Sequence, residues 1–174
     1  LHLIDSDKIQ EPTFSPDSKK VAYVKDNNIF VKNLETSSVT QITSDGLKNS
    51  IINGICDWVY EEEFAFVRAF EWSGDSKNIA FLRFDESEVP TFSMDIVGNE
   101  LYPKQQVFKY PKAGEKNAKV TLQLYNLETE NTSKINLGDY EYIPRIKWTN
   151  NSNIICVTTL NRHQNILNLN FVNA

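Results

Sequence analysis

The sequence predicts an all-β fold, and more specifically part of a β-propeller. Two observations support this prediction. A turn motif flanked by strands occurs three times, and further short runs alternate apolar and polar residues as half-buried strands do. Propeller blades are small antiparallel sheets repeated around an axis, so short strands, polar turns and a repeat of tens of residues fit this architecture. One short helical insert is also expected, at an acidic run described below.

The turn motif consists of an aromatic residue that ends one strand, a polar turn, and a new apolar strand. Its copies are TFSPDSKKVAY at 13–23, EWSGDSKNIAF at 71–81 and, more weakly, KWTNNSNIICV at 147–157. Pro16 and Gly74 suit turn positions, and the side chains of Asp17 and Asp75 can accept hydrogen bonds from the turn backbone. Each copy therefore predicts a tight turn between two strands of one blade.

A second repeated element follows the motif. Its copies are NIFVKNLET at 28–36 and LQLYNLET at 122–129, and ILNLNF at 166–171 alternates in the same way. A period of two is that of a strand with one buried face. We expect these segments to be blade strands, with a polar hairpin after each Leu-Glu-Thr.

Together the two elements predict two fairly complete blades and part of a third. The expected blades lie near residues 10–48, 70–137 and 146–174, with inserts at 49–70 and 85–117 and a leading strand near His2 to Ile4. Propellers close with about four to eight blades, so this chain cannot close a ring alone. We therefore expect residues 1–174 to be a fragment of a longer propeller.

Composition excludes several classes of protein. The formal net charge is -5 and no Lys/Arg-rich run is present, which argues against a nucleic-acid partner. No apolar stretch is long enough to span a bilayer. Cys56 and Cys156 lie far apart, without other ligands at metal-binding spacing, so neither a metal site nor a cofactor is expected.

The insert at 85–117 looks irregular and exposed. It contains YPK at 102–104 and YPKAG at 110–114. Proline cannot donate a backbone hydrogen bond, so it interrupts regular pairing between strands. Extended or looped chain is expected here.

The acidic run DWVYEEEF at 57–64 is the strongest local signal. Asp57 can cap a short helix, and glutamates in the first turns interact favourably with the helix dipole. The run is compatible with a solvated helix-capping segment, a cation-binding site or a catalytic carboxylate pair. The D-x-D-x-D-G spacing of a calcium loop is absent, and neighbouring side chains on one turn rarely flank a sugar as glycosidase carboxylates do. Arg68, one turn after Phe64, could pair with one of the glutamates.

At these residues the sequence resembles a known family. DWVYEEE at 57–63 resembles the double-glutamate motif of the dipeptidyl peptidase IV family, in the prolyl oligopeptidase clan. FDESEVP at 84–90, YPKAG at 110–114 and LNRHQN at 160–165 agree with that family in the same order. The resemblance extends from about Gln10 to the C-terminus. The sequence EEEFAFVRAF at 61–70 is most similar to that of Bacteroidetes-type bacterial members.

The resemblance implies a fold and a reaction. The fold is the N-terminal eight-bladed propeller that caps an α/β-hydrolase domain, and the reaction removes dipeptides with Pro or Ala in second position from free N-termini. By motif position, Glu62 and Glu63 would bind the α-ammonium of the substrate. Glu61 is not assigned that role, and Tyr60, Glu61 and Arg68 are possible supporting residues.

The resemblance also implies what lies outside this chain. Hydrolysis needs a Ser-Asp-His triad with its serine on a G-x-S-x-G elbow, and none of the six glycines forms one. We therefore expect the hydrolase domain to be absent and the isolated chain to be inactive. The expected partners are free-N-terminus peptides, the protein's own hydrolase domain and a second copy bound through the arm at 91–115. The expected location is periplasmic, secreted or on the bacterial cell surface.

Two other functions remain open. The chain could come from a non-enzymatic periplasmic propeller that binds protein partners, of the Tol-associated type, which shares the Phe-Ser-Pro-Asp repeat. It could also come from a related tripeptidyl or acylaminoacyl peptidase. The glutamate motif favours the dipeptidyl type over both, since an interaction propeller does not need it.

Overall fold

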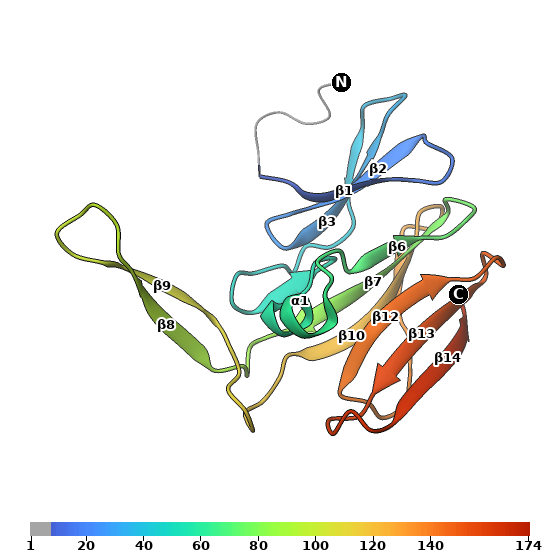
Figure 1. Ribbon diagram of the computed structural model, residues 1–174. Helices are drawn as coiled ribbons and strands as arrows, with labels where there is room; N and C mark the ends of the chain where they lie inside the picture. The colour runs from blue at the N-terminus through green and yellow to red at the C-terminus, as the bar shows by residue number, and fades with distance from the viewer. Residues whose placement is uncertain (1–7) are drawn as a thin grey trace.

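The computed structural model describes residues 8–174, which form three antiparallel sheets, a projecting two-stranded arm and one short helix (Figure 1). The leading strand expected near His2 to Ile4 lies outside the described residues. The first sheet contains β1 (Gln10–Phe14), β2 (Lys20–Lys25), β3 (Asn28–Asn33) and β4 (Val39–Gln41). The second contains β5 (Ile51–Asn53), β6 (Phe70–Trp72), β7 (Asn78–Asp85), β10 (Lys119–Asn126) and β11 (Asn131–Lys134). The third contains β12 (Tyr142–Trp148), β13 (Ile154–Leu160) and β14 (Leu167–Asn173).

The turn motif forms the predicted turns. In the first sheet Ser15 Oγ donates a hydrogen bond to Asp17 Oδ1 over 2.6 Å, and in the second Ser73 Oγ donates to Asp75 Oδ1 over the same distance. Each serine backbone N–H also donates across the turn, to Lys20 O in the first sheet and to Asn78 O in the second, both over 2.9 Å. The two copies therefore share side-chain and backbone geometry.

The second sheet begins earlier than residue 70. Both β5 and β6 pair with β7, β5 near the end of β7 and β6 near its start. They are two halves of one strand position, and the chain between them leaves the sheet and returns. Only the central part of the expected insert at 49–70 is therefore outside the sheet, because Ile51–Asn53 already pairs with β7.

The third sheet has the strand order β12-β13-β14 and begins at Tyr142, ahead of the expected residue 146. Pro144 lies within β12, where the pairing register with β13 shifts between Tyr142 and Arg145. A proline in a strand is tolerated at such an irregularity, since its missing N–H is not needed for a ladder bond. The three successive antiparallel sheets confirm the predicted all-β, partial-propeller fold.

The expectation of irregular chain at 85–117 is wrong for its central part. Strands β8 (Thr91–Ile96) and β9 (Lys104–Lys109) pair in continuous antiparallel register. Together they extend away from the sheets (Figure 1). Pro90, Pro103 and Pro111 all lie just outside the paired residues, so they delimit the hairpin instead of interrupting it. This hairpin is called the arm below.

The hydrophobic core lies within and between the three sheets. Its largest fully buried side chains come mainly from the middle strands, with Ile29 from the first sheet, Phe81 and Leu122 from the second, and Ile143 and Ile155 from the third. One continuous cluster therefore joins all three sheets and the inner face of the helix. Among residues 8–174, no helix has the length and apolar character needed to cross a bilayer.

Candidate functional site

The acidic run forms the expected helix, α1 (Trp58–Phe64). Asp57 is its N-cap, with extended backbone angles, and its Oδ1 accepts a hydrogen bond of 3.0 Å from the Tyr60 backbone N–H. Ala65 ends the helix in a left-handed conformation with φ 54°. The N-cap predicted from the sequence is confirmed.

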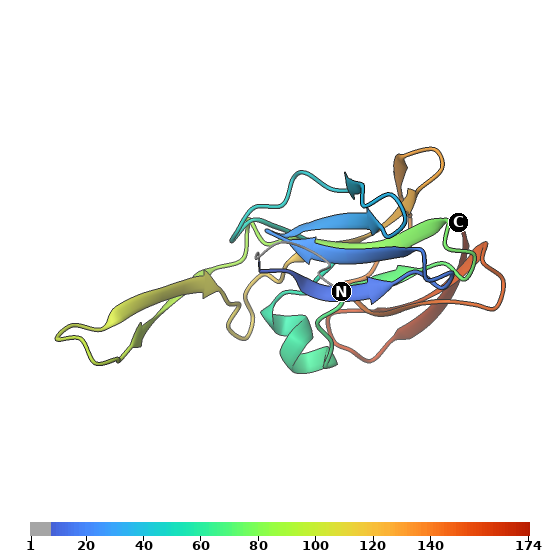
Figure 2. The same cartoon turned by 90° about the horizontal axis from the view of Figure 1, so that it is seen from above.

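The helix stands on a narrow neck between β5 and β6. In Figure 2 it projects from one side of the sheets. Four contacts join the two sides of the neck: Ala69 N–H to Gly54 O at 2.9 Å, the Ile55–Arg68 bridge, Cys56 N–H to Val67 O at 3.0 Å, and Cys56 Sγ to Phe66 O at 2.8 Å. Burial raises the pKa of Cys56 to about 12, so its thiol stays protonated and can donate this last bond. The neck thus fixes where the helix leaves the sheet.

Tyr60 anchors the inner face of the helix to the third sheet. Its side chain is fully buried, and its hydroxyl oxygen accepts a hydrogen bond of 2.9 Å from the backbone N–H of Ile143. Its ring lies against Phe64, Phe66 and Phe84, with centroids 4.9 to 5.7 Å away. Burial holds the pKa of Tyr60 well above its ordinary value. Tyr60 therefore serves the helix as a structural anchor.

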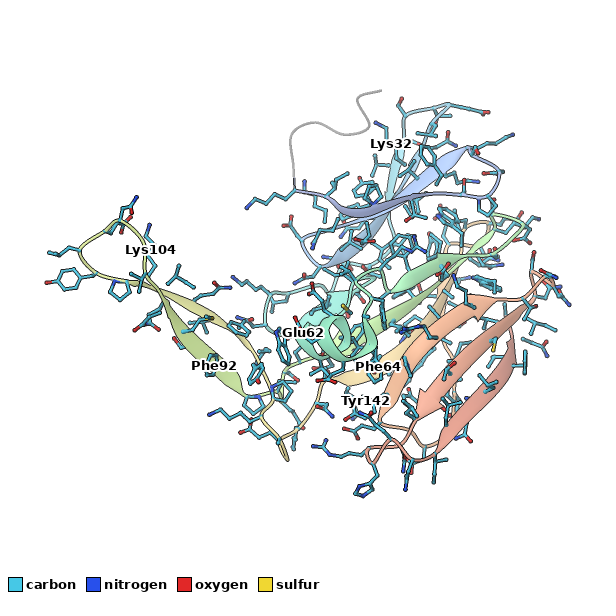
Figure 3. All side chains as sticks on the ribbon, viewed as in Figure 1. Lys32, Glu62, Phe64, Phe92, Lys104 and Tyr142 are labelled. Carbon is cyan, nitrogen blue, oxygen red and sulfur yellow. The ribbon has the colours of Figure 1, made fainter. Side chains whose placement is uncertain are left out.

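The solvent-exposed part of the helix carries the three glutamates. Glu61, Glu62 and Glu63 are all exposed, and Figure 3 labels Glu62 on the helix. Within the described part of the chain, none of the three carboxylates forms a hydrogen bond or ion pair. Here the run is a solvated acidic face on a rigidly held helix, with its charge uncompensated by side chains of residues 8–174.

Arg68 does not pair with the glutamate run. Its guanidinium forms an ion pair with Glu71 Oε1 at 3.3 Å and donates a hydrogen bond to Thr13 Oγ1 at 3.4 Å. Lys147 approaches the same Glu71 oxygen, at 3.0 Å. The pairing that helical spacing would allow does not form, because the helix ends at Phe64 and Arg68 belongs to the returning side of the neck.

Two buried carboxyl groups lie near the N-terminus of the helix. Burial raises the pKa of Asp57 to about 6, against the backbone hydrogen bonds that it accepts. Burial and the nearby charge of Asp57 raise the pKa of Glu86 to about 7, and Lys109 opposes this shift. Glu86 lies just after β7, where the arm leaves the second sheet, so these charges connect the helix N-terminus with the base of the arm.

Several residues around the helix could not be identified from the sequence. In the third sheet, the Ile143 backbone N–H donates to Tyr60 and the Tyr142 ring packs against Phe64. Tyr110, just after the arm, contacts Trp58. Tyr110 belongs to the YPKAG motif at 110–114, to which the sequence assigns no role. Ile143 cannot be recognised from its residue type, because its backbone N–H makes the contact. Among residues 8–174, no group of three or more His, Cys, Asp or Glu side chains could hold a metal ion.

The arrangement can bind a cation by charge, since it presents adjacent carboxylates on a projecting and anchored helix.

The family described as the dipeptidyl peptidase IV (DPP IV) N-terminal region matches residues 2–174. Among solved structures, the chain is similar to Porphyromonas gingivalis dipeptidyl peptidase 4, with 45% identity and a TM-score of 0.94 over 98% of this chain and 25% of that one. A putative dipeptidyl aminopeptidase IV from Bacteroides ovatus gives 26% identity and a TM-score of 0.81 over 97% of this chain and 23% of that one.

Similar sequences include probable dipeptidyl-aminopeptidase B proteins of fungi. The protein from Talaromyces stipitatus is 37% identical over 92% of this chain and 19% of its own length. The protein from Phaeosphaeria nodorum is 38% identical over 94% of this chain and 20% of its own length. The chain thus spans about a fifth of the length of these relatives.

Proposed function

Since the chain belongs to the family of dipeptidyl peptidase IV N-terminal regions, we propose that it is the substrate-recognition portion of a serine-type peptidase that releases dipeptides from free peptide N-termini. The preferred second residue is Pro or Ala. Catalysis belongs to a hydrolase domain of the same protein, outside residues 1–174, and the isolated chain does not hydrolyse peptides. The names of its relatives, dipeptidyl peptidase 4 and dipeptidyl-aminopeptidase B, support this class of reaction.

One observation carries the proposal: Glu62 and Glu63 lie side by side on an anchored helix and have no partner within residues 8–174. A substrate α-ammonium supplies the missing positive charge, and charge-assisted hydrogen bonds contribute roughly 1.5–3 kcal/mol each. Binding the ammonium at one point sets the distance from the N-terminus to the scissile bond. An N-blocked peptide offers no cation and cannot form these charge-assisted hydrogen bonds, which gives the specificity.

The test uses the full-length protein and a Gly-Pro chromogenic substrate, with and without N-acetylation. Glu62→Ala and Glu63→Ala should each lower kcat/KM for the free amine by ~100-fold, from a loss of about 3 kcal/mol. Glu61→Ala should cause a smaller loss. Glu35→Ala, an equal change of charge in an exposed hairpin of the first sheet, is the matched control and should keep wild-type kinetics.

Two outcomes would contradict the proposal. Glutamate variants that keep the wild-type preference for the free amine would remove Glu62 and Glu63 from substrate binding. Release of tripeptides, identified by mass spectrometry of the products, would assign the protein to the tripeptidyl class.

We also propose that the arm contributes to a homodimer and that the protein is periplasmic, secreted or on the cell surface. Both faces of the arm expose large apolar side chains: Met94, Ile96, Val97, Leu101, Tyr102 and Val107. A segment of this kind on a projecting hairpin is suited to a protein contact. Replacing 95–105 by a short Gly-Ser turn should convert the dimer into a monomer in analytical ultracentrifugation; an unchanged mass would exclude the arm as the contact.

A further inference from the structure

The chain that returns from the arm contacts the helix region at two points. This return segment, residues 110–117, connects β9 to β10. At its start, the ring of Tyr110 meets Trp58, the first residue of α1, and at its end Asn117 meets Tyr142, against which Phe64 packs. The two ends of the helix are therefore both linked to one short segment.

The first contact is aromatic. Tyr110 and Trp58 meet edge to face with a centroid distance of 4.5 Å. Phe92 of β8 and Phe108 of β9 lie 5.5 and 6.3 Å from the Tyr110 ring and 5.8 Å from each other. The Tyr110 ring is thus supported by both strands of the arm before it reaches the helix, and an edge-to-face pair of this kind has a preferred geometry that resists sliding.

The second contact is polar. Asn117 Nδ2 donates hydrogen bonds to Tyr142 Oη at 2.9 Å and to Glu141 Oε1 at 2.8 Å. Arg162 holds the same region by donating to Glu141 Oε1 at 2.8 Å and to Glu115 O at 2.6 Å. The centroid of the Tyr142 ring lies 5.6 Å from that of Phe64. Figure 3 labels both residues. The return segment is therefore attached to the third sheet as well as to the helix.

The helix needs such contacts to have a defined direction. Seven residues are too few for a helix that is stable by itself. The neck and Tyr60 attach its base and inner face, but both act near the sheet. Trp58, two residues before Tyr60, is 37% exposed, and the Tyr110 ring packs against it.

We propose that Tyr110, acting through Trp58, is a positioning residue for the substrate contacts of Glu62 and Glu63. The inference rests on the proposed function of those glutamates. Binding geometry is sensitive to small displacements, since a shift of about 1 Å in a group that orients the substrate can cost on the order of 100-fold in rate. Removing the Tyr110 ring lets the N-terminal turn of α1 move and weakens the hold on the substrate ammonium.

The experiment compares Tyr110→Ala and Trp58→Ala with Tyr110→Phe in the full-length protein. Tyr110→Phe keeps the ring and loses a hydroxyl that forms no hydrogen bond within residues 8–174, so it should keep wild-type kinetics. Each alanine variant should lower kcat/KM for the free-amine Gly-Pro substrate by about tenfold, mainly through KM. The ratio of free-amine to N-acetylated turnover should fall by the same factor, a change that a general loss of folded protein would not produce.

Glu62→Ala is measured alongside, so that the two proposals can fail separately. If Glu62→Ala reduces the preference for the free amine but both alanine variants keep the wild-type ratio, the positioning role of Tyr110 is excluded and the substrate role of Glu62 stands. If Glu62→Ala keeps that preference, both proposals fall. Should Tyr110→Ala fail to fold, Trp58→Ala decides the matter, because its half-exposed side chain can be shortened without opening the core.

Discussion

The indole nitrogen of Trp148 donates a hydrogen bond to the backbone carbonyl of Glu71, 3.1 Å away in the preceding sheet. Trp72, the matching residue of the second motif copy, donates in the same way to Thr13 O of the first sheet, at 3.2 Å. Thr13 and Glu71 are themselves matching positions of the repeat. The bond thus recurs at each of the two junctions and joins the edge strands β1, β6 and β12 of successive sheets.

Trp72→Phe and Trp148→Phe should therefore lower the free energy of unfolding by similar amounts, about 1 kcal/mol each for one lost hydrogen bond. Denaturant unfolding of the full-length protein measures the loss. Trp58→Phe is the matched control, since no hydrogen bond of its indole is found within residues 8–174, and it should change stability little. Equal losses in all three variants would show that the junction bonds contribute nothing specific.

Tyr60→Phe should destabilise the attachment of α1. The substitution keeps the ring but leaves the buried N–H of Ile143 without an acceptor, at a cost of roughly 1–3 kcal/mol. Tyr23→Phe is the control: its ring is also buried, but its hydroxyl forms no hydrogen bond within the described residues. Hydrogen exchange of the Ile143 amide should accelerate in Tyr60→Phe alone; unchanged exchange would show that the hydroxyl is dispensable.

Gly54→Ala should be strongly destabilising, because it combines two costs. Gly54 has φ 77°, which side-chain-bearing residues rarely adopt, and an added Cβ would lie 2.6 Å from Ile29 Cγ1 in the core. Gly138 has the same φ but no atom within 4 Å of the added Cβ, so Gly138→Ala isolates the backbone cost. We expect about 1 kcal/mol for Gly138→Ala and a further 1–3 kcal/mol for Gly54→Ala, measured by thermal unfolding. Equal losses would mean that the core relaxes around the new methyl group.

The buried carboxyl of Asp57 should make stability depend on pH. Its pKa is about 6 in the folded protein and ~3.9 in the unfolded chain. The folded state therefore binds the proton more tightly, so the stabilising contribution is complete below pH ~4 and is lost as pH rises through 6.

Asp57→Asn keeps a good helix cap and cannot ionise. Relative to wild type, its free energy of unfolding should rise by about 2–3 kcal/mol between pH 4 and pH 8. Glu86→Gln should behave in the same direction, since burial and Asp57 raise the pKa of Glu86 to about 7. Denaturant unfolding at both pH values checks this, and a difference from wild type that is constant with pH would contradict the buried-acid interpretation.

The local features of this protein follow from the sequence by itself. The Ser-x-Asp turns of the first two motif copies and the Asp57 cap depend on hydrogen bonds between residues a few positions apart. Such bonds are specified by residue type and spacing, so a pattern in the sequence is sufficient to predict them. The run at 57–63 also identified the family that the comparisons then showed.

The tertiary structure decided how the helix is held. The Tyr60 hydroxyl meets the backbone of Ile143 in another sheet, Tyr110 reaches Trp58 from the arm, and Arg68 turns to Glu71 instead of the glutamate run. The arm is a regular hairpin because its prolines fall outside the paired residues, a matter of register that composition does not reveal. These contacts join distant parts of the chain, and they depend on where packed sheets bring side chains together, for which local periodicity carries no information.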